Sequence, residues 1–228
     1  MTDDGDVSGK TAWGQAVAAV ALVGALGVGV WAAEGDSSGE SEPKPAACSG
    51  GKAEKGERGV SGAQLCKALN RKDLAELLGT PGEIAKTASG SGSTLELAGG
   101  REIHTPSAEV QFESYTVHLS ATNDGLPVAG SGTLLGDTEK QRKFMGRPAV
   151  LYSDRTLAIR FRLDGSDADS GPGVPARVLS VAQDANDRGG SFELTLWRED
   201  GEVPDDTVLF QVAAQVLPTI PGWAAATR

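Results

Sequence analysis

The pattern of hydrophobic and polar positions first separates an uncharged N-terminal run from the rest of the chain. Residues 11–33 carry no charge, and Trp13 and Trp31 stand near the two ends of the run. A membrane helix needs about 20 apolar residues, and indole rings favour the two headgroup levels. The pattern therefore predicts a transmembrane helix, a signal-anchor, over residues 12–33, preceded by a short cytoplasmic tail over residues 1–11.

Two other interpretations of this run stay open. Val30 and Ala32 suit a signal-peptidase site, so cleavage after Ala32 is one alternative. The other is a short core helix of a soluble protein, because Ala, Val and Gly make up most of the run. The length of the run and the acidic segment before it favour the uncleaved anchor.

Small residues recur at every fourth position within the run, a spacing that lets two membrane helices approach closely. They are Ala21, Ala25, Gly29 and Ala33. The series permits a weak dimer, although such spacing also arises readily by chance in a run rich in Ala and Gly.

Beyond the run, residues 34–60 are rich in Gly, Ser, Glu, Lys and Pro and have no apolar periodicity. Such a segment cannot offset its ordering entropy by burial, so it is predicted to be a flexible extracytoplasmic linker. The folded domain is then expected over residues 61–228.

Two short helices are predicted at the start of this domain. Ser61 and Gln64 have the spacing of a capping box, and an apolar stripe follows them. A second stripe begins after Asn70, which can cap it, with Asp73 in its first turn. Gly79 and Pro81 end this second helix.

Strand patterns dominate the middle of the chain. Residues 88–109 are rich in Gly and Ser and are interpreted as loops around one short strand. "EVQFESYTVHLSA" changes its apolar phase and predicts a strand with a bulge near Ser114. "AVLYSDRTLAIRFRL" predicts a hairpin that turns at "YSDRT", with four apolar side chains facing inward: Leu157, Ile159, Phe161 and Leu163.

A further hairpin is predicted in "ARVLSVAQDANDRGGSFELTLWRED", although residues 176–185 also fit a helix. The last apolar stripe, in "PDDTVLFQVAAQVLP", predicts a helix with acidic residues in its first turn. The expected fold class is therefore α+β: an N-terminal membrane helix, two short helices, an antiparallel sheet of hairpins, and a C-terminal helix packed on one face.

Charge and cysteine content restrict the partners and the compartment. The net charge of −10 opposes binding to nucleic acid, because nucleic-acid binding gains affinity by neutralising phosphates with Lys and Arg. The two cysteines, Cys48 and Cys66, both follow the uncharged run and are predicted to form a disulfide. An oxidising exterior would allow that bond, so the domain is expected outside a single-pass cell-membrane anchor.

Three segments carry a family resemblance: "GRPAVLYSDRTLAIRF", "GGSFELTLWRED" and "VLPTIPGW". They resemble a family of membrane-anchored extracytoplasmic proteins of high-GC actinobacteria, classed as a domain of unknown function. The resemblance covers the anchor and most of residues 60–228. It implies a location and a fold class, and it brings no activity and no catalytic residues.

Catalytic motifs are scarce. The chain has two histidines, His104 and His118, no C-x-x-C motif, and no G-x-S-x-G motif over residues 61–228, so neither a nucleophile of the folded domain nor a zinc ligand set emerges. His118 is predicted on a strand at a sheet edge. No cofactor and no enzyme activity are expected. An acidic loop offers oxygen ligands for weak Ca²⁺ binding, through Asp164, Asp167 and Asp169.

The sequence therefore favours a non-catalytic binding or accessory module of the cell envelope. Arg160 and Arg162 stand two apart on the outer face of the predicted hairpin, where they could bind a carboxylate or phosphate of a cell-wall component or partner protein. Pairing with local acids is the alternative role for these arginines. An envelope hydrolase that uses loop carboxylates and a sensor ectodomain with a partner membrane protein remain the alternative functions.

Overall fold

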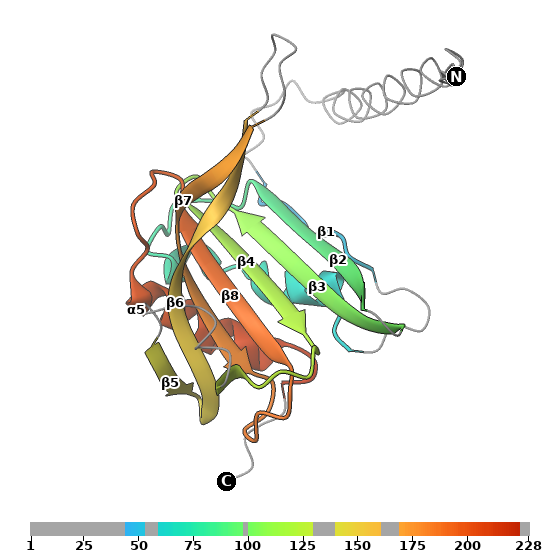
Figure 1. Ribbon diagram of the computed structural model, residues 1–228. Helices are drawn as coiled ribbons and strands as arrows, with labels where there is room; N and C mark the ends of the chain where they lie inside the picture. Colours follow the sequence, from blue (N-terminus) through green and yellow to red (C-terminus); the bar gives the residue numbers. More distant parts are fainter. Residues whose placement is uncertain (1–43, 53–58, 98–99, 130–139, 161–168, 224–228) are drawn as a thin grey trace, which may run out of the picture. The chain divides into compact units, whose positions relative to one another are not determined.

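The computed structural model describes residues 44–52, 59–97, 100–129, 140–160 and 169–223 (Figure 1). The predicted membrane helix over residues 12–33, with its alternatives and its series of small residues, lies outside the described residues. Among the residues that are described, no helix is long and apolar enough to cross a membrane.

One eight-stranded sheet dominates the described part of the chain (Figure 1). Its strands are ordered β1-β2-β3-β4-β8-β7-β6-β5, and all neighbours are antiparallel except β1 and β2, so the sheet is mixed. The strands are β1 (Ser49–Gly50), β2 (Thr87–Leu97), β3 (Arg101–Gln111), β4 (Tyr115–Thr122), β5 (Lys140–Phe144), β6 (Arg147–Arg160), β7 (Asp169–Ala182) and β8 (Ser191–Arg198).

The expected fold class is wrong in its proportions. The helices of the described chain are short, and strands reach into segments that were expected to be loops. The Gly/Ser-rich stretch forms β2 and much of β3. The two strands pair along their whole lengths: Thr87 lies opposite Gln111 at one end, and Leu97 lies opposite Arg101 at the other. Low β-propensity in this stretch is overridden by cross-strand pairing and by a helix that packs on it.

The helices lie on one face of the sheet: α2 (Gly62–Leu69), α3 (Leu74–Leu77), α5 (Asp206–Val216) and the 3₁₀ turn η1 (Leu217–Thr219). The capping box is confirmed, because Ser61 accepts the Gln64 backbone N–H and the Gln64 side chain accepts the Ser61 N–H. Asn70 is the C-cap of α2 and does not begin α3, and Asp205 caps α5.

The main hydrophobic core lies between these helices and the sheet. Each strand contributes alternate side chains to it, and α2 and α5 contribute their apolar stripes. Its fully buried leucines are Leu65, Leu69, Leu74, Leu119, Leu151, Leu179, Leu194, Leu209 and Leu217. Burial of such side chains contributes roughly 1.5–3 kcal/mol each. This face therefore supplies most of the hydrophobic stabilisation.

Two glycines let α2 approach the sheet more closely than a side chain would allow. A Cβ at Gly90 would lie 2.8 Å from the backbone nitrogen of Ala63 and closer still to the Gly62 carbonyl. A Cβ at Gly62 would lie 2.6 Å from the backbone nitrogen of Ser91. The glycine at position 90 of β2 is therefore a packing requirement, because the backbone of the helix start rests on the backbone of the strand.

The end of the predicted linker belongs to the folded unit, which begins at Pro45. Ala46 donates its N–H to Ala85, and β1 adds a short parallel strand to the edge of β2. Cys48 is bonded to Cys66 on α2, with their Cα atoms 5.9 Å apart. The predicted disulfide partners are thus joined, and residues 45–52, which were predicted to lie in the linker, belong to the folded unit.

Two strand predictions are wrong in opposite ways. "YSDRT" does not turn the chain, because β6 continues from Arg147 to Arg160 and absorbs the irregularity as a register shift between Arg155 and Leu157. Leu157, expected to face inward, is 71 % exposed. Conversely, the bulge expected near Ser114 is the turn between β3 and β4.

The hairpin of β7 and β8 and the C-terminal helix are confirmed, and the residues of 176–185 up to Ala182 form a strand.

A buried arginine fastens the segment that follows α5. Arg147 is 1 % exposed, and its guanidinium lies 3.8 Å from the centroid of the Trp223 ring. It also donates a hydrogen bond to the Gln183 carbonyl. A planar cation suits this position, because it stacks on the indole while its N–H groups reach backbone oxygens.

Candidate functional site

The face of the sheet that the helices leave uncovered carries two parallel rows of mostly polar side chains. Cross-strand register places Glu109, His118, Thr195, Val178 and Tyr152 in one row across five strands. The next row places Gln111 opposite Thr116, and continues through Trp197 and Ala176 to Asp154. Side chains on one face at neighbouring register positions interact, so the two rows form one surface.

One end of this open face is covered by a small second core. Val128, from the segment after β4, packs with Val150, Tyr152, Val178 and Ala182. The segment is held in place by Asp187, whose carboxylate accepts the backbone N–H groups of Val128 and Ala129 at 2.8 Å each. The cover leaves the rest of the face accessible.

A groove of about 360 Å³ occupies the accessible part of the open face. It extends from β3 to β6, over five adjacent strands, which is roughly 19 Å at the usual strand spacing. Its lining residues are Glu109, His118, Asp154, Arg155, Thr156, Leu157, Ala176, Thr195 and Trp197. The register shift in β6 shapes one wall, because Asp154 to Leu157 all contribute to it.

Burial perturbs two ionisable groups in the groove. The pKa of Glu109 is raised, first because the carboxyl is partly desolvated and second because the carboxylate of Glu199 lies nearby. The pKa of His118 is lowered by burial, against the opposing influence of Glu193. The imidazole is therefore neutral at pH 7, and the groove has a net negative charge.

Two other acids at the edge of the groove are already bonded. Tyr152 donates its hydroxyl to Glu193 at 2.8 Å, and the pKa of Tyr152 is raised by burial and by that carboxylate. Thr116 donates its hydroxyl to Glu199 at 2.7 Å. These bonds fix both carboxylates against the sheet and keep their charge next to the groove.

Three groups in the groove make no hydrogen bond to another described residue: the carboxylate of Glu109, the imidazole of His118 and the indole N–H of Trp197. All three side chains are half-buried. Half-buried polar groups without protein partners are available to a ligand, and convergent groups of this kind are the usual mark of a binding site.

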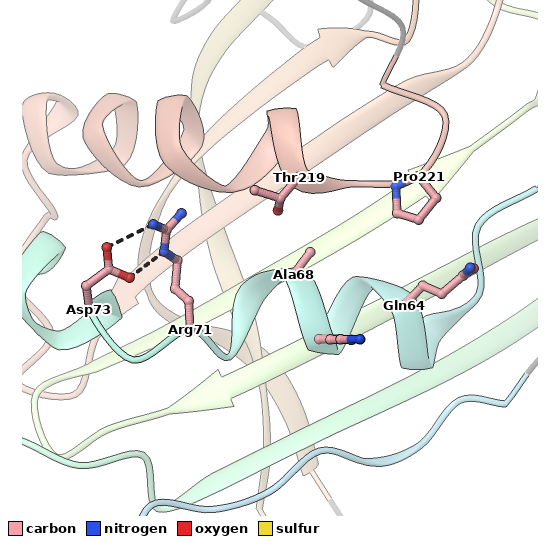
Figure 2. Close-up of a pocket in the computed structure, with 7 residues that line it drawn as sticks. Gln64, Ala68, Arg71, Asp73, Thr219 and Pro221 are labelled. Atoms are coloured by element: carbon pink, nitrogen blue, oxygen red, sulfur yellow. Dashed lines mark hydrogen bonds and ion pairs between the residues drawn. The ribbon is translucent and has the colours of Figure 1, made fainter.

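A second hollow, of about 480 Å³, lies on the helix-covered side between α2 and the segment after α5 (Figure 2). Its main cation is already used, as Figure 2 shows: Arg71 donates from Nε and Nη2 to the Asp73 carboxylate, at 2.5 and 2.8 Å. Arg71 Nη1 also donates to the Gln215 carbonyl at 2.5 Å. This arrangement fastens α5 to the corner between α2 and α3, so we assign the hollow a structural role.

Apart from Cys48 and Cys66, the site residues predicted from the sequence fall outside the part of the chain whose side chains the structure describes. Arg160 lies on β6 opposite Asp169 on β7, but neither side chain is among those described. Arg162, Asp164 and Asp167 lie outside the described residues. Among the described residues, no three acidic, histidine or cysteine side chains gather as a metal site.

His118 does not lie at a sheet edge, because β4 is paired on both sides, with β3 and β8. Sequence reasoning did not predict that Glu109, Thr195 and Trp197 lie beside this histidine in the groove. The available signal was the alternation of polar residues along β4 and β8, but their register could not be read from the sequence.

The chemistry open to this groove is recognition through hydrogen bonds, charge and aromatic contact. A carboxyl with a raised pKa beside a neutral imidazole also has the elements of acid–base chemistry. No serine, threonine or cysteine of the described chain is hydrogen-bonded to His118, so an activated nucleophile is not assembled there.

Comparison with known proteins gives a family and no function. A model of a family of unknown function, DUF6215, matches residues 7–138, more than half of the chain. No curated protein matches the chain, and no solved structure matches it.

Proposed function

This chain belongs to DUF6215, a family of unknown function, and from its geometry we propose that the folded unit is a non-catalytic binding module of the cell envelope whose ligand lies on the open face of the sheet. The observation that carries the proposal is the groove in which Glu109, His118 and Trp197 have no hydrogen-bond partner among the described residues. Beside the other large hollow, Arg71 and Asp73 are already paired with each other.

The extracytoplasmic location is part of the same proposal. It is supported by the bond between Cys48 and Cys66, since disulfides persist mainly in oxidising compartments. Attachment to the membrane through residues 12–33 and an origin in a high-GC actinobacterium are supported by the uncharged run and by the resemblance of three segments. Recovery of the chain in the membrane pellet after alkaline carbonate washing would agree with attachment, and release would contradict it.

The proposal is tested by photo-crosslinking in the producing cells. A photoreactive residue replaces Leu157, which is exposed at the groove wall, in one full-length variant and Gln211, which is exposed on α5, in a matched variant. We expect a discrete adduct from position 157 and none from position 211. Equal adducts from both positions, or none from position 157, would contradict a ligand on the open face.

An envelope hydrolase is the second candidate, and the raised pKa of Glu109 next to the neutral His118 favours it over a sensor. Its test is direct. Turnover of peptidoglycan fragments or glycosides by the full-length protein, abolished in Glu109→Gln and retained in Glu102→Gln, would replace the binding module by an enzyme.

A further inference from the structure

The groove on the open face is acidic, because the carboxylates in and beside it outnumber its basic residue, Arg155. Glu109 and Asp154 line the groove, and Glu193 and Glu199 border it. Arg155 lines the same wall but donates from Nη1 to the Gly173 carbonyl at 3.0 Å. A ligand that enters the groove therefore meets an excess of negative charge, which repels phosphates and carboxylates.

The position of Glu109 near a second carboxylate favours the binding of a cation in the groove. Its carboxylate is partly desolvated and lies near the carboxylate of Glu199, so it carries an unfavourable interaction that no cation among the described residues relieves. A cation bound between the two carboxylates would relieve the repulsion and offset the desolvation. A neutral ligand would relieve neither.

The remaining surface suits the rest of a cationic side chain. Trp197 lies in the row next to His118, on the strand beside Ala176, and Leu157 projects at the groove wall. An indole attracts an ammonium or guanidinium over its face, by roughly 0.5–1 kcal/mol at exposed sites. Apolar neighbours can cover the methylene stem of a lysine or arginine.

We propose that the groove between Glu109 and Trp197 binds a lysine or arginine side chain of an extended segment of a partner polypeptide. The length of the groove across five strands fits an extended segment, and its charge fits a cationic one. The inference deepens the proposed function, on which it rests, by naming the chemical class of the ligand.

The test measures binding of tetralysine to the full-length protein in detergent by isothermal titration calorimetry, with tetraserine and tetraglutamate as probes of the same length. We expect tetralysine to bind, the other two peptides not to bind, and the affinity to fall as salt is raised. Glu109→Gln should weaken tetralysine binding about tenfold. Trp197→Leu should weaken it about two- to fivefold.

The matched control is Glu102→Gln, which removes the same charge from the same strand outside the groove. It should leave the affinity unchanged, and thermal unfolding should show that all three variants are folded. Equal weakening by Glu102→Gln, or equal affinity of wild-type protein and Glu109→Gln, would overturn the inference.

The failure of this inference differs from the failure of the proposed function. If tetralysine does not bind while position 157 still crosslinks in cells, the cationic class is wrong and the binding module stands. Binding of tetraserine as tight as that of tetralysine has the same meaning. If position 157 gives no adduct, the open face is not a binding surface and both proposals fall.

Discussion

On the face of the sheet that the helices cover, Arg71 and Asp73 next to the hollow are bonded to each other, whereas in the groove of the open face several polar side chains are bonded to no described residue. Arg71 reaches both Asp73 and the end of α5. Glu109, His118 and Trp197 find no such partners among the described residues. The difference teaches that a hollow is better judged by the state of its polar groups than by its volume, since the larger of these two is the more completely paired.

The comparison extends to the two sides of single strands. Along β8, the buried side chains of Phe192, Leu194 and Leu196 face the helices, while Glu193 and Thr195 face the open side. The buried side of the strand therefore stabilises the fold, and side chains on the open side can be replaced with little effect on stability. Each of the following predictions tests that division.

The largest effect is expected from neighbouring residues of β8. Leu194→Ala should lower the free energy of unfolding by about 2–5 kcal/mol, because a fully buried leucine leaves a cavity. Thr195→Ala should change it by no more than about 0.5 kcal/mol. Denaturant unfolding of the two full-length variants measures both. Comparable losses would mean that the open face is as structural as the covered one.

A second pair of variants tests how closely the covered face is packed. Gly90→Ala should cost about 1–3 kcal/mol, because the new Cβ meets the backbone at the start of α2. Gly92→Ala, two residues along the same strand, meets nothing within 4 Å and should be neutral or stabilise by up to about 1 kcal/mol. Thermal unfolding compares them. Identical shifts would contradict the backbone contact between α2 and β2.

The smallest effect concerns pH. The pKa of His118 is lowered in the folded protein by burial, so the unfolded chain takes up the proton first as the pH falls through about 6.5. Stability is therefore lost on acidification through that range. His118→Asn should flatten this part of the profile. Glu109 acts in the opposite direction, because its raised pKa favours the folded state as the pH falls.

The reference for this pH experiment is His104→Asn, which changes an exposed histidine on β3. If His104→Asn flattens the profile as much as His118→Asn does, burial on the open face is not the cause.

The parts of the fold that could be predicted are those set by local chemistry. The capping box at Ser61 and Gln64 and the helix that follows Asp205 depend on residues within four positions of one another. The parts that failed depend on distant contacts. The residues "YSDRT" prefer a turn. However, β6 pairs with β7 both before and after the register shift between Arg155 and Leu157, and this pairing keeps the strand extended through a bulge.

The candidate site could not be predicted for the same reason. Glu109, His118, Trp197 and Asp154 lie on four different strands, and they meet only because of the register of four strand pairings among five neighbouring strands. A shift of one residue in any pairing would move the affected side chains to the covered face. Their polar alternation indicates that some face is open, but not which residues share it.

The bond between Cys48 and Cys66 has a mechanical consequence. When the chain is pulled from its N-terminal side, the load passes at Cys48 through the covalent bridge into α2 and bypasses the residues between the two cysteines. The bypassed loop includes β1, whose two-residue pairing with β2 would otherwise peel away at low force. With the bond intact, about 60 Å of chain at full extension is withheld from stretching, and the first element to bear tension is a helix anchored in the core.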